Sequence, residues 1–268
     1  MEAGAIYITR WGTSGPKVIM VHGGAQGGTG GEYNFEVQAA LAERGYQVIV
    51  PDRPGHGRSA DPGRPDDAAL DAVWLADMLG DGAHLVGHSF GGCVALAATA
   101  MRPEAVRSLT FIEPAMLGLA THVANVRRLL FRLLAAKYFS LSAESRATRS
   151  MAILGIPTEK IGGLEPGQLK RQGKGLAQIR MPSKAILHRE LTEVKRAGIP
   201  LLVVTGGWSP AFEAASDVVA SLGGGRRAVI QSEHHFPQRV SDEFNQIFVA
   251  FMEQSDATSA TRHDPHRS

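Results

Sequence analysis

The residues with the clearest chemical potential form the segment GHSFG at positions 87–91. This G-x-S-x-G pattern follows a short apolar run, residues 84–86, that predicts a strand, and it precedes a run that predicts a helix from Gly91. A serine at such a sharp turn is exposed, and the flanking glycines leave room for the two elements to cross. Free N–H groups at the helix start stabilise negative charge beside the hydroxyl. The pattern therefore predicts that Ser89 is a nucleophile.

Two further motifs directly follow predicted strands. HGG, residues 22–24, follows the apolar run 17–21, and PDRPGHGRS, residues 51–59, follows the run 46–50. The glycines after position 22 lack the Lys-Ser/Thr pair of a phosphate-binding loop, so a turn is expected there. The proline and glycine residues of the second motif predict a tight turn, in which Asp52 has a structural role.

Together with VGHSFGG, these motifs resemble the α/β-hydrolase superfamily, and they occur in the order typical of it. The resemblance covers about residues 5–253, except for an inserted stretch without a matching motif. It implies that backbone N–H groups of Gly24 and Phe90 form an oxyanion hole, with Ala25 as the alternative to Gly24. Such a hole stabilises the charged oxygen of a tetrahedral intermediate.

A serine hydroxyl needs a base to accept its proton, and the superfamily places a histidine after the last strand. Here that region reads VIQSEHHFPQ, residues 229–238, and His235 fits the usual ending better than His234, which stays the alternative. The adjacent pair is not a metal site, because neighbouring side chains diverge and no third ligand is apparent. Three other histidines lie in or beside the motifs and are expected to form local hydrogen bonds: His22, His56 and His88.

The acid that orients the histidine departs from the commonest pattern of the superfamily. Ser209 stands in GGWSPAFEAASD where an aspartate is usual, and a hydroxyl does not stabilise an imidazolium as a carboxylate does. Some members place the acid at the end of the preceding strand, which here gives Glu113 in SLTFIEPA. Glu113 is the predicted acid, with Glu213, Asp217 or a water-bridged Ser209 as alternatives.

The elements that must position these residues alternate along the chain. Apolar runs rich in β-branched residues predict strands, and intervening stretches with helical periodicity predict helices. This alternation predicts an α/β class fold with a doubly wound, mainly parallel sheet. The predicted strands cover residues 5–11, 17–21, 46–50, 84–86, 108–112, 199–205 and 227–230, and the predicted helices cover 34–44, 66–79, 91–101, 210–222 and 241–253.

The alternation stops between residues 114 and 198, where a basic amphipathic helix is predicted over 123–137, followed by shorter helices. This stretch holds 15 Lys and Arg and 5 Asp and Glu, whereas the rest of the chain holds 13 and 21. We interpret residues 114–198 as a helical lid inserted into a core formed by 1–113 and 199–253. Residues 254–268 have few apolar side chains, which predicts a disordered tail.

Composition excludes several classes of protein. A net charge of +2 over 268 residues gives no general case for nucleic-acid binding, and the single cysteine, Cys93, excludes an intramolecular disulfide. No metal site is predicted from Cys and His spacing. The first residues do not resemble a signal sequence, and no apolar run of about 18 residues occurs. We therefore expect a cytoplasmic location and no stable membrane insertion. The sequence leaves the oligomeric state open.

The predicted chemistry is hydrolysis of an ester or lactone of a small organic substrate through an acyl-enzyme on Ser89, without a cofactor. The same residues also suit carbon–carbon or amide bond hydrolysis, and the superfamily includes cofactor-free lyases and oxygenases. A non-catalytic receptor for a small molecule is the alternative from another class. Haloalkane displacement is disfavoured, because it uses an aspartate nucleophile where this chain has Ser89.

Overall fold

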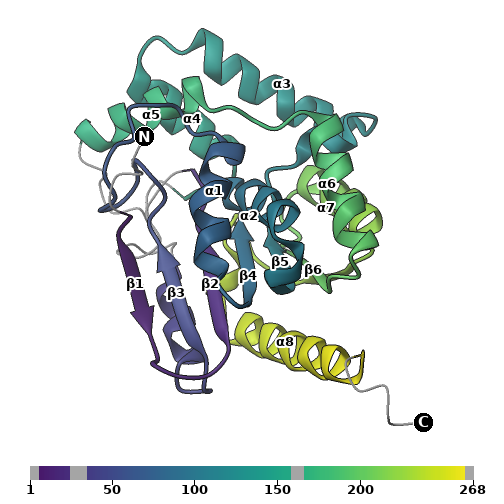
Figure 1. Ribbon diagram of the computed structural model, residues 1–268. Helices are drawn as coiled ribbons and strands as arrows, with labels where there is room; N and C mark the ends of the chain where they lie inside the picture. Colours follow the sequence, from purple (N-terminus) through teal and green to yellow (C-terminus); the bar gives the residue numbers. More distant parts are fainter. Residues whose placement is uncertain (1–5, 25–34, 158–165, 263–268) are drawn as a thin grey trace.

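A computed structural model describes residues 6–24, 35–157 and 166–262 of the chain (Figure 1). These residues form a seven-stranded sheet with the order β1-β3-β2-β4-β5-β6-β7. All neighbouring strands are parallel except β1, which pairs antiparallel with β3 at one edge. The predicted α/β fold is therefore confirmed. The strands are β1 Ile8–Trp11, β2 Lys17–Val21, β3 Gln47–Pro51, β4 Ala83–His88, β5 Val106–Ile112, β6 Leu201–Thr205 and β7 Arg226–Val229.

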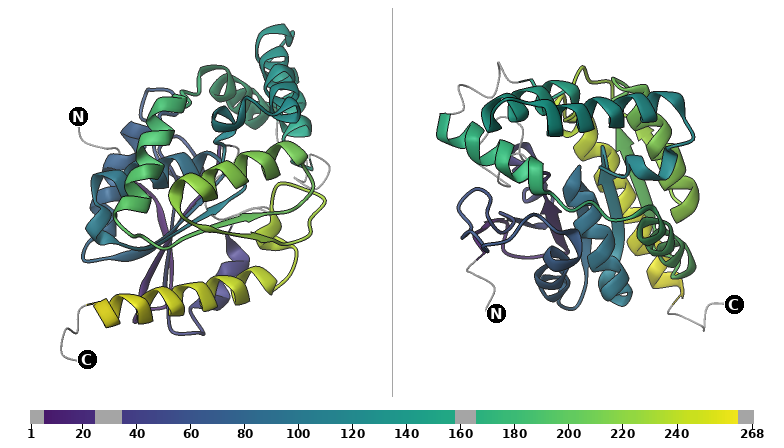
Figure 2. Two further views of the ribbon diagram at one scale, coloured as in Figure 1. Left: turned by 90° about the vertical axis from the view of Figure 1, so that its right-hand side faces the viewer. Right: turned by 90° about the horizontal axis from the view of Figure 1, so that it is seen from above.

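Helices cover both faces of the sheet, as Figure 2 shows. One face carries α1 (Ala68–Leu79), α2 (Phe90–Met101), α6 (Lys184–Arg196) and α7 (Pro210–Gly223), whose apolar side chains share one core with the sheet. The other face carries α8 (Glu243–Arg262) and a short 3-10 helix, η1 (Glu36–Leu41). Because both faces are covered, the central strands β4 and β6 are buried along their whole length.

The predicted helix over 34–44 is only the short η1 in the structure. Phe35 precedes it, and its apolar side chain cannot accept a capping hydrogen bond from the first turn. The chain then turns at Gly45, whose φ of 85° favours glycine. The residues on the amino side of this element, 25–34, lie outside the described part of the chain and include Ala25.

The inserted stretch divides into two parts. Helices α3 (Ala124–Phe139), α4 (Ala143–Ile153) and α5 (Pro166–Gln178) lie beyond the carboxyl ends of the parallel strands, after a 3-10 turn, η3 (Leu117–Ala120) (Figure 1). Helix α6 instead packs against α2 and α7, and its Leu187, Leu191 and Val194 belong to the core of the sheet. Of the described inserted helices, only α3, α4 and α5 therefore lie beyond the carboxyl ends of the strands.

The prediction of a disordered tail from residue 254 is wrong for its first part, because α8 continues to Arg262. Ser255 is buried and its hydroxyl donates a hydrogen bond of 2.7 Å to the carbonyl of Phe251. Asp256 accepts a hydrogen bond of 2.9 Å from Arg107, which anchors this turn to β5. Polar residues are therefore compatible with an ordered helix here, because the sheet supplies their partners.

The contact between α4 and α5 gives a test of how the inserted helices pack. A Cβ atom at Gly173 of α5 would lie 1.7 Å from the carbonyl oxygen of Ala143 in α4, whereas one at Gly175 would meet nothing within 4 Å. We expect Gly173→Ala to lower the melting temperature by several degrees, since overpacking costs about 1–3 kcal/mol. The control Gly175→Ala should leave the melting temperature unchanged or raise it, because alanine is about 1 kcal/mol more favourable than glycine inside a helix. Equal melting temperatures of the two variants in calorimetry would contradict this packing.

Candidate active site

The turn between β4 and α2 holds Ser89 in a strained backbone conformation, with φ 53° and ψ −121°. Glycines make the turn possible: a Cβ atom at Gly87 would lie 2.5 Å from the carbonyl oxygen of Gly91, and one at Gly91 would lie 2.3 Å from that of Val21. The N–H of Ser89 donates a hydrogen bond of 2.9 Å to Ile112 of β5. The strand-to-helix turn expected from the sequence is present.

The loop after β2 lies against this turn. A Cβ atom at Gly23 would be only 2.9 Å from the Cβ of Ser89, so the backbone of this loop closely approaches the serine side chain. Phe90 is the first residue of α2, and the N–H groups of a first helical turn have no acceptor within their helix. Gly24 directly follows Gly23, and Phe90 directly follows Ser89, so the two predicted oxyanion donors come from two different elements next to this contact.

Arg53 is a buried residue whose part in this site the sequence did not reveal. Its guanidinium donates hydrogen bonds to the carbonyls of His22 at 3.2 Å and Gly23 at 3.1 Å, and to the carboxylate of Asp71 at 2.8 Å. The peptide carbonyl of Gly23 and the N–H of Gly24 belong to one planar unit. By holding the carbonyl, Arg53 therefore also sets the direction of the N–H.

His22 supports the same peptide. Its Nε2 accepts the backbone N–H of Arg53 at 2.8 Å, so its Nδ1 carries the proton and donates to the carbonyl of Gly23 at 2.7 Å. Burial and the nearby Arg53 keep the pKa of His22 well below its ordinary value, which maintains the neutral ring. An arginine among turn-forming residues, followed by several aspartates, was the available signal in the sequence.

Asp52, the acid of the same motif, has the predicted structural role. Its carboxylate accepts the backbone N–H of Arg58 at 2.9 Å. A Cβ atom at Gly57 would lie 2.3 Å from this carboxylate, so the tight turn depends on glycine. His56 likewise bonds locally, to the carboxylate of Asp66 at 3.0 Å.

The structure brings His235 and Glu113 together although 122 positions separate them in the sequence. The Nδ1 of His235 lies 3.4 Å from the Oε2 of Glu113, and both side chains are 1% exposed or less. The other carboxylate oxygen of Glu113 accepts the N–H of Gly206 at 2.6 Å. His234 instead closes its own turn, with its Nδ1 3.0 Å from the hydroxyl of Ser232.

Aromatic rings and a backbone hydrogen bond hold His235 in place. Its ring packs near those of Phe212, at 4.8 Å between centroids, and Trp208, at 6.1 Å. His88, directly before Ser89, donates from Nε2 to the carbonyl of His235 at 2.8 Å, so it links the serine turn to the histidine loop. The sequence predicted only a local bond for His88. Within the described ranges, the Nε2 of His235 has no hydrogen-bond partner.

Burial shifts the pKa values of the histidine and the acid in opposite directions. It lowers the pKa of His235 to about 3, with a smaller contribution from the neighbouring His234. It raises the pKa of Glu113 to about 7, although the hydrogen bond from Gly206 acts the other way. The imidazole is therefore neutral near pH 7, the form that can accept a proton.

The alternative acids are engaged elsewhere. Glu213 accepts hydrogen bonds from the N–H of Gly207 at 3.1 Å and the hydroxyl of Thr205 at 2.9 Å, and it pairs with Arg227. Asp217 is 70% exposed and lies 3.6 Å from the same arginine. Ser209 begins α7 without a side-chain capping bond. Among the described residues, the carboxylate of Glu113 lies within ion-pair distance of His235, and neither carboxylate of the alternatives does.

Cys93 is fully buried on α2, as the sequence predicted. Burial raises the pKa of its thiol to about 12, so the thiol is not a nucleophile near neutral pH. In the part of the chain that the structure covers, no group of three His, Cys, Asp or Glu residues is arranged to hold a metal ion.

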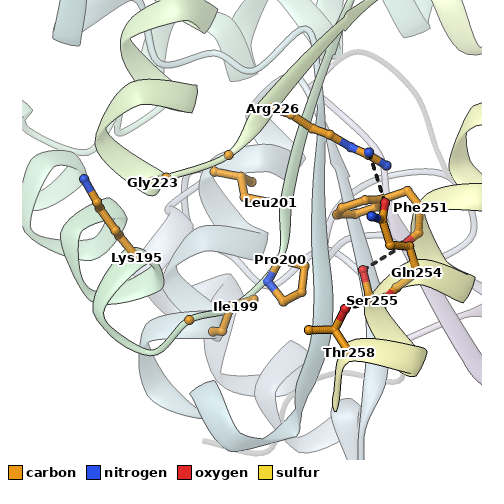
Figure 3. Close-up of a pocket in the computed structure, with 13 residues that line it drawn as sticks. Lys195, Ile199, Pro200, Leu201, Gly223, Arg226, Phe251, Gln254, Ser255 and Thr258 are labelled. Atoms are coloured by element: carbon orange, nitrogen blue, oxygen red, sulfur yellow. Dashed lines mark hydrogen bonds between the residues drawn. The ribbon is translucent and has the colours of Figure 1, made fainter. Parts of the chain in front are cut away.

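A separate hollow of about 440 Å³ lies between the carboxyl ends of α6 and α7 and one side of α8 (Figure 3). Leu201, at the amino end of β6, lines it, whereas Ser89 follows the carboxyl end of β4. The two places are at opposite ends of a parallel sheet. The lining of this hollow contains no histidine, cysteine or carboxylate, so the nucleophile and its base are not found there. Its arginine, Arg226, donates a hydrogen bond of 3.1 Å to Gln254.

Comparisons with known proteins agree with the fold. A family model described as alpha/beta hydrolase fold matches residues 16–152. Lipase LipV of Mycobacterium tuberculosis is 34% identical over 151 residues, which are 54% of this chain and 54% of the lipase. The chain spans about half the length, or less, of the first curated relatives it matches.

Two further proteins are similar over more of their length. A 2-hydroxy-6-oxo-6-phenylhexa-2,4-dienoate hydrolase of Comamonas testosteroni is 29% identical over 259 residues, 90% of this chain and 88% of that protein. The solved structure of an esterase from Exiguobacterium antarcticum matches with a TM-score of 0.68 and 20% identity, over 92% of this chain and 95% of that one. This last likeness concerns the fold alone.

The close approach of Gly23 to Ser89 predicts the effect of a single methyl group. Gly23→Ala should displace the serine side chain and slow its labelling by a fluorophosphonate by about a hundredfold, because small misplacements at a reacting centre are costly. Labelling rates are measured by mass spectrometry of the peptide that contains Ser89. The control is Gly118→Ala, where a Cβ atom meets nothing within 4 Å. Equal labelling rates of the two variants would contradict the close approach.

Proposed function

Because the chain belongs to the α/β-hydrolase family, we propose that it is a serine hydrolase that cleaves esters or lactones of small organic molecules. The observation that carries this proposal is the buried pair of His235 and Glu113, 3.4 Å apart, joined through His88 to the strained turn of Ser89. A nucleophile, a base and an acid that orients the base are the parts that acyl transfer to water requires.

In the proposed mechanism, the hydroxyl of Ser89 attacks the carbonyl carbon of the substrate while the Nε2 of His235 accepts its proton. The N–H groups of Gly24 and Phe90 stabilise the oxygen that becomes negatively charged. His235 then donates the proton to the leaving group, which leaves an acyl group on Ser89. A water molecule, deprotonated by the same imidazole, releases the acid and restores the serine.

Glu113 keeps the imidazole in the tautomer with its proton on Nδ1 and stabilises the imidazolium that forms. The contact with His235 is at ion-pair distance, and such contacts commonly shorten when a substrate binds. Glu113 can serve although Ser209 stands at the usual place of the acid. The ends of the adjacent strands β5 and β6 lie side by side, so a carboxylate on either can reach one histidine.

The substrate class is supported by relatives rather than by a pocket. Curated relatives include a lipase and an esterase of Mycobacterium tuberculosis, which favours ester hydrolysis. The dienoate hydrolase of Comamonas testosteroni aligns along 90% of the chain, which favours carbon–carbon bond hydrolysis as a second candidate. Both reactions use a serine, a base and an oxyanion hole, so a panel of esters, lactones and dienoates separates them.

Substitution of the acids tests the proposed function directly. Glu113→Gln should lower kcat for aryl esters by about 10⁴-fold, because a neutral amide holds the wrong tautomer and does not stabilise an imidazolium. Glu213→Gln is the matched control and should retain turnover, since Glu213 is paired with Arg227. Ser89→Ala should abolish turnover and phosphonate labelling. No labelling of Ser89 and no turnover in the unmodified chain would favour a non-catalytic receptor.

The shifted pKa values predict how the activity depends on pH. As the pH falls, the Glu113 and His235 pair takes up its first proton near pH 7, because burial raises the pKa of Glu113 to about 7. Protonation removes the carboxylate that stabilises the imidazolium, so kcat/KM should decline by about tenfold per pH unit below that value. The residual activity of Glu113→Gln should lack this decline. A flat profile of the unmodified chain through neutral pH would contradict the assignment.

A further inference from the structure

Helix α3 has an apolar face that no described part of the chain covers. Its inner side packs on η3 and α7 through Val126 and Leu129. On the opposite side, Phe131, Leu134 and Tyr138 are 72%, 52% and 68% exposed. The spacings of three and four residues place these three side chains on one helix face.

The apolar face continues past the end of the helix. Phe139 is 77% exposed, and Leu141, in the following turn, is fully exposed. Single exposed apolar side chains are ordinary, but five large ones within eleven residues form a patch of the kind that marks an interaction surface. Figure 2 shows α3 at the outer edge of the molecule, on the same side of the sheet as the carboxyl ends of the strands.

Cations surround this patch. Arg128 and Arg132 are exposed on α3, and neither forms an ion pair with a described residue. Lys137 lies on the other flank of the face. Helices α3, α4 and α5 together contain nine Lys and Arg and a single carboxylate, Glu144. The surface is thus apolar at its centre and strongly basic around it.

We propose that the outer face of α3 binds the surface of an anionic lipid bilayer. Aromatic and leucine side chains would enter the boundary between headgroups and acyl chains, and the cations would contact the phosphates. This binding is peripheral: among the described residues, no helix has the length and apolarity to cross a membrane. The inference stands on the surface alone and does not depend on the chemistry of Ser89.

The charge of the patch favours lipid over a second copy of this chain. A symmetric dimer built on α3 would bring the same patch from both subunits together, and with it the same unpaired cations. Such like charges at close range destabilise the contact, whereas anionic headgroups neutralise them. The cations are also spread over three helices, which suits an extended charged surface rather than a single binding groove.

Sedimentation with vesicles tests the proposal. The whole chain should bind vesicles of phosphatidylcholine with one third phosphatidylglycerol, should bind phosphatidylcholine alone much less, and should be released by salt. Arg128→Gln with Arg132→Gln should weaken binding by about fivefold for each cation removed. Phe131→Ser with Tyr138→Ser should weaken it further, because the buried apolar area is lost.

A matched control lies on α1, where Leu70 and Val73 are 48% and 52% exposed beside aspartates. Leu70→Ser with Val73→Ser should leave vesicle binding unchanged. Misfolding is excluded if every variant hydrolyses a water-soluble substrate at the rate of the unmodified chain. If the unmodified chain hydrolyses none, an unchanged circular dichroism spectrum serves the same purpose. Equal binding to both vesicle types, or a dimer in light scattering that Phe131→Ser with Tyr138→Ser dissociates, would overturn the proposal.

Discussion

Two strained residues at the ends of adjacent strands organise this molecule. Among the described residues other than glycine, only Ser89 and Glu113 have positive φ, at 53° and 46°. Each such residue costs about 1–3 kcal/mol, and such strain is concentrated at functional sites. Backbone hydrogen bonds maintain it, because Ser89 donates to Ile112 of β5 and Glu113 donates to Val204 of β6. These two hydrogen bonds fix both strained residues to the neighbouring strands at the carboxyl end of the sheet.

The strained turns depend on glycines around them and on a buried network beneath them. Gly87 and Gly91 allow α2 to start within contact of β2. Below the loop after β2, the charge of Arg53 is balanced by Asp66 and Asp71. Although burial opposes ionisation, Arg53 and His56 hold the pKa of Asp66 below its usual value. A buried cation needs such partners, because an unpaired one is costly.

Much of the fold could be predicted because it rests on local patterns. The predicted strand over 17–21 coincides with β2, and the helix expected after Ser89 is α2. The predictions were wrong where tertiary contacts determine whether a segment is ordered or where a helix packs. Polar residues after 253 suggested disorder, but Arg107 of a distant strand pairs with Asp256 and extends α8. Likewise, α6 reads as part of an insertion along the chain but packs on the sheet, because its leucines face α2 and α7.

The sequence by itself determined the chemical groups: a serine in a glycine-flanked turn, a histidine pair after the last strand, and an absent aspartate at position 209. It could rank Glu113 above the other acids only through a resemblance. The tertiary structure decided which carboxylate faces His235 and which is paired with Arg227. It also revealed Arg53 beneath the loop and the uncovered face of α3. The position of Arg53 and the exposure of α3 depend on which surfaces pack against each other, and local sequence patterns do not specify this packing.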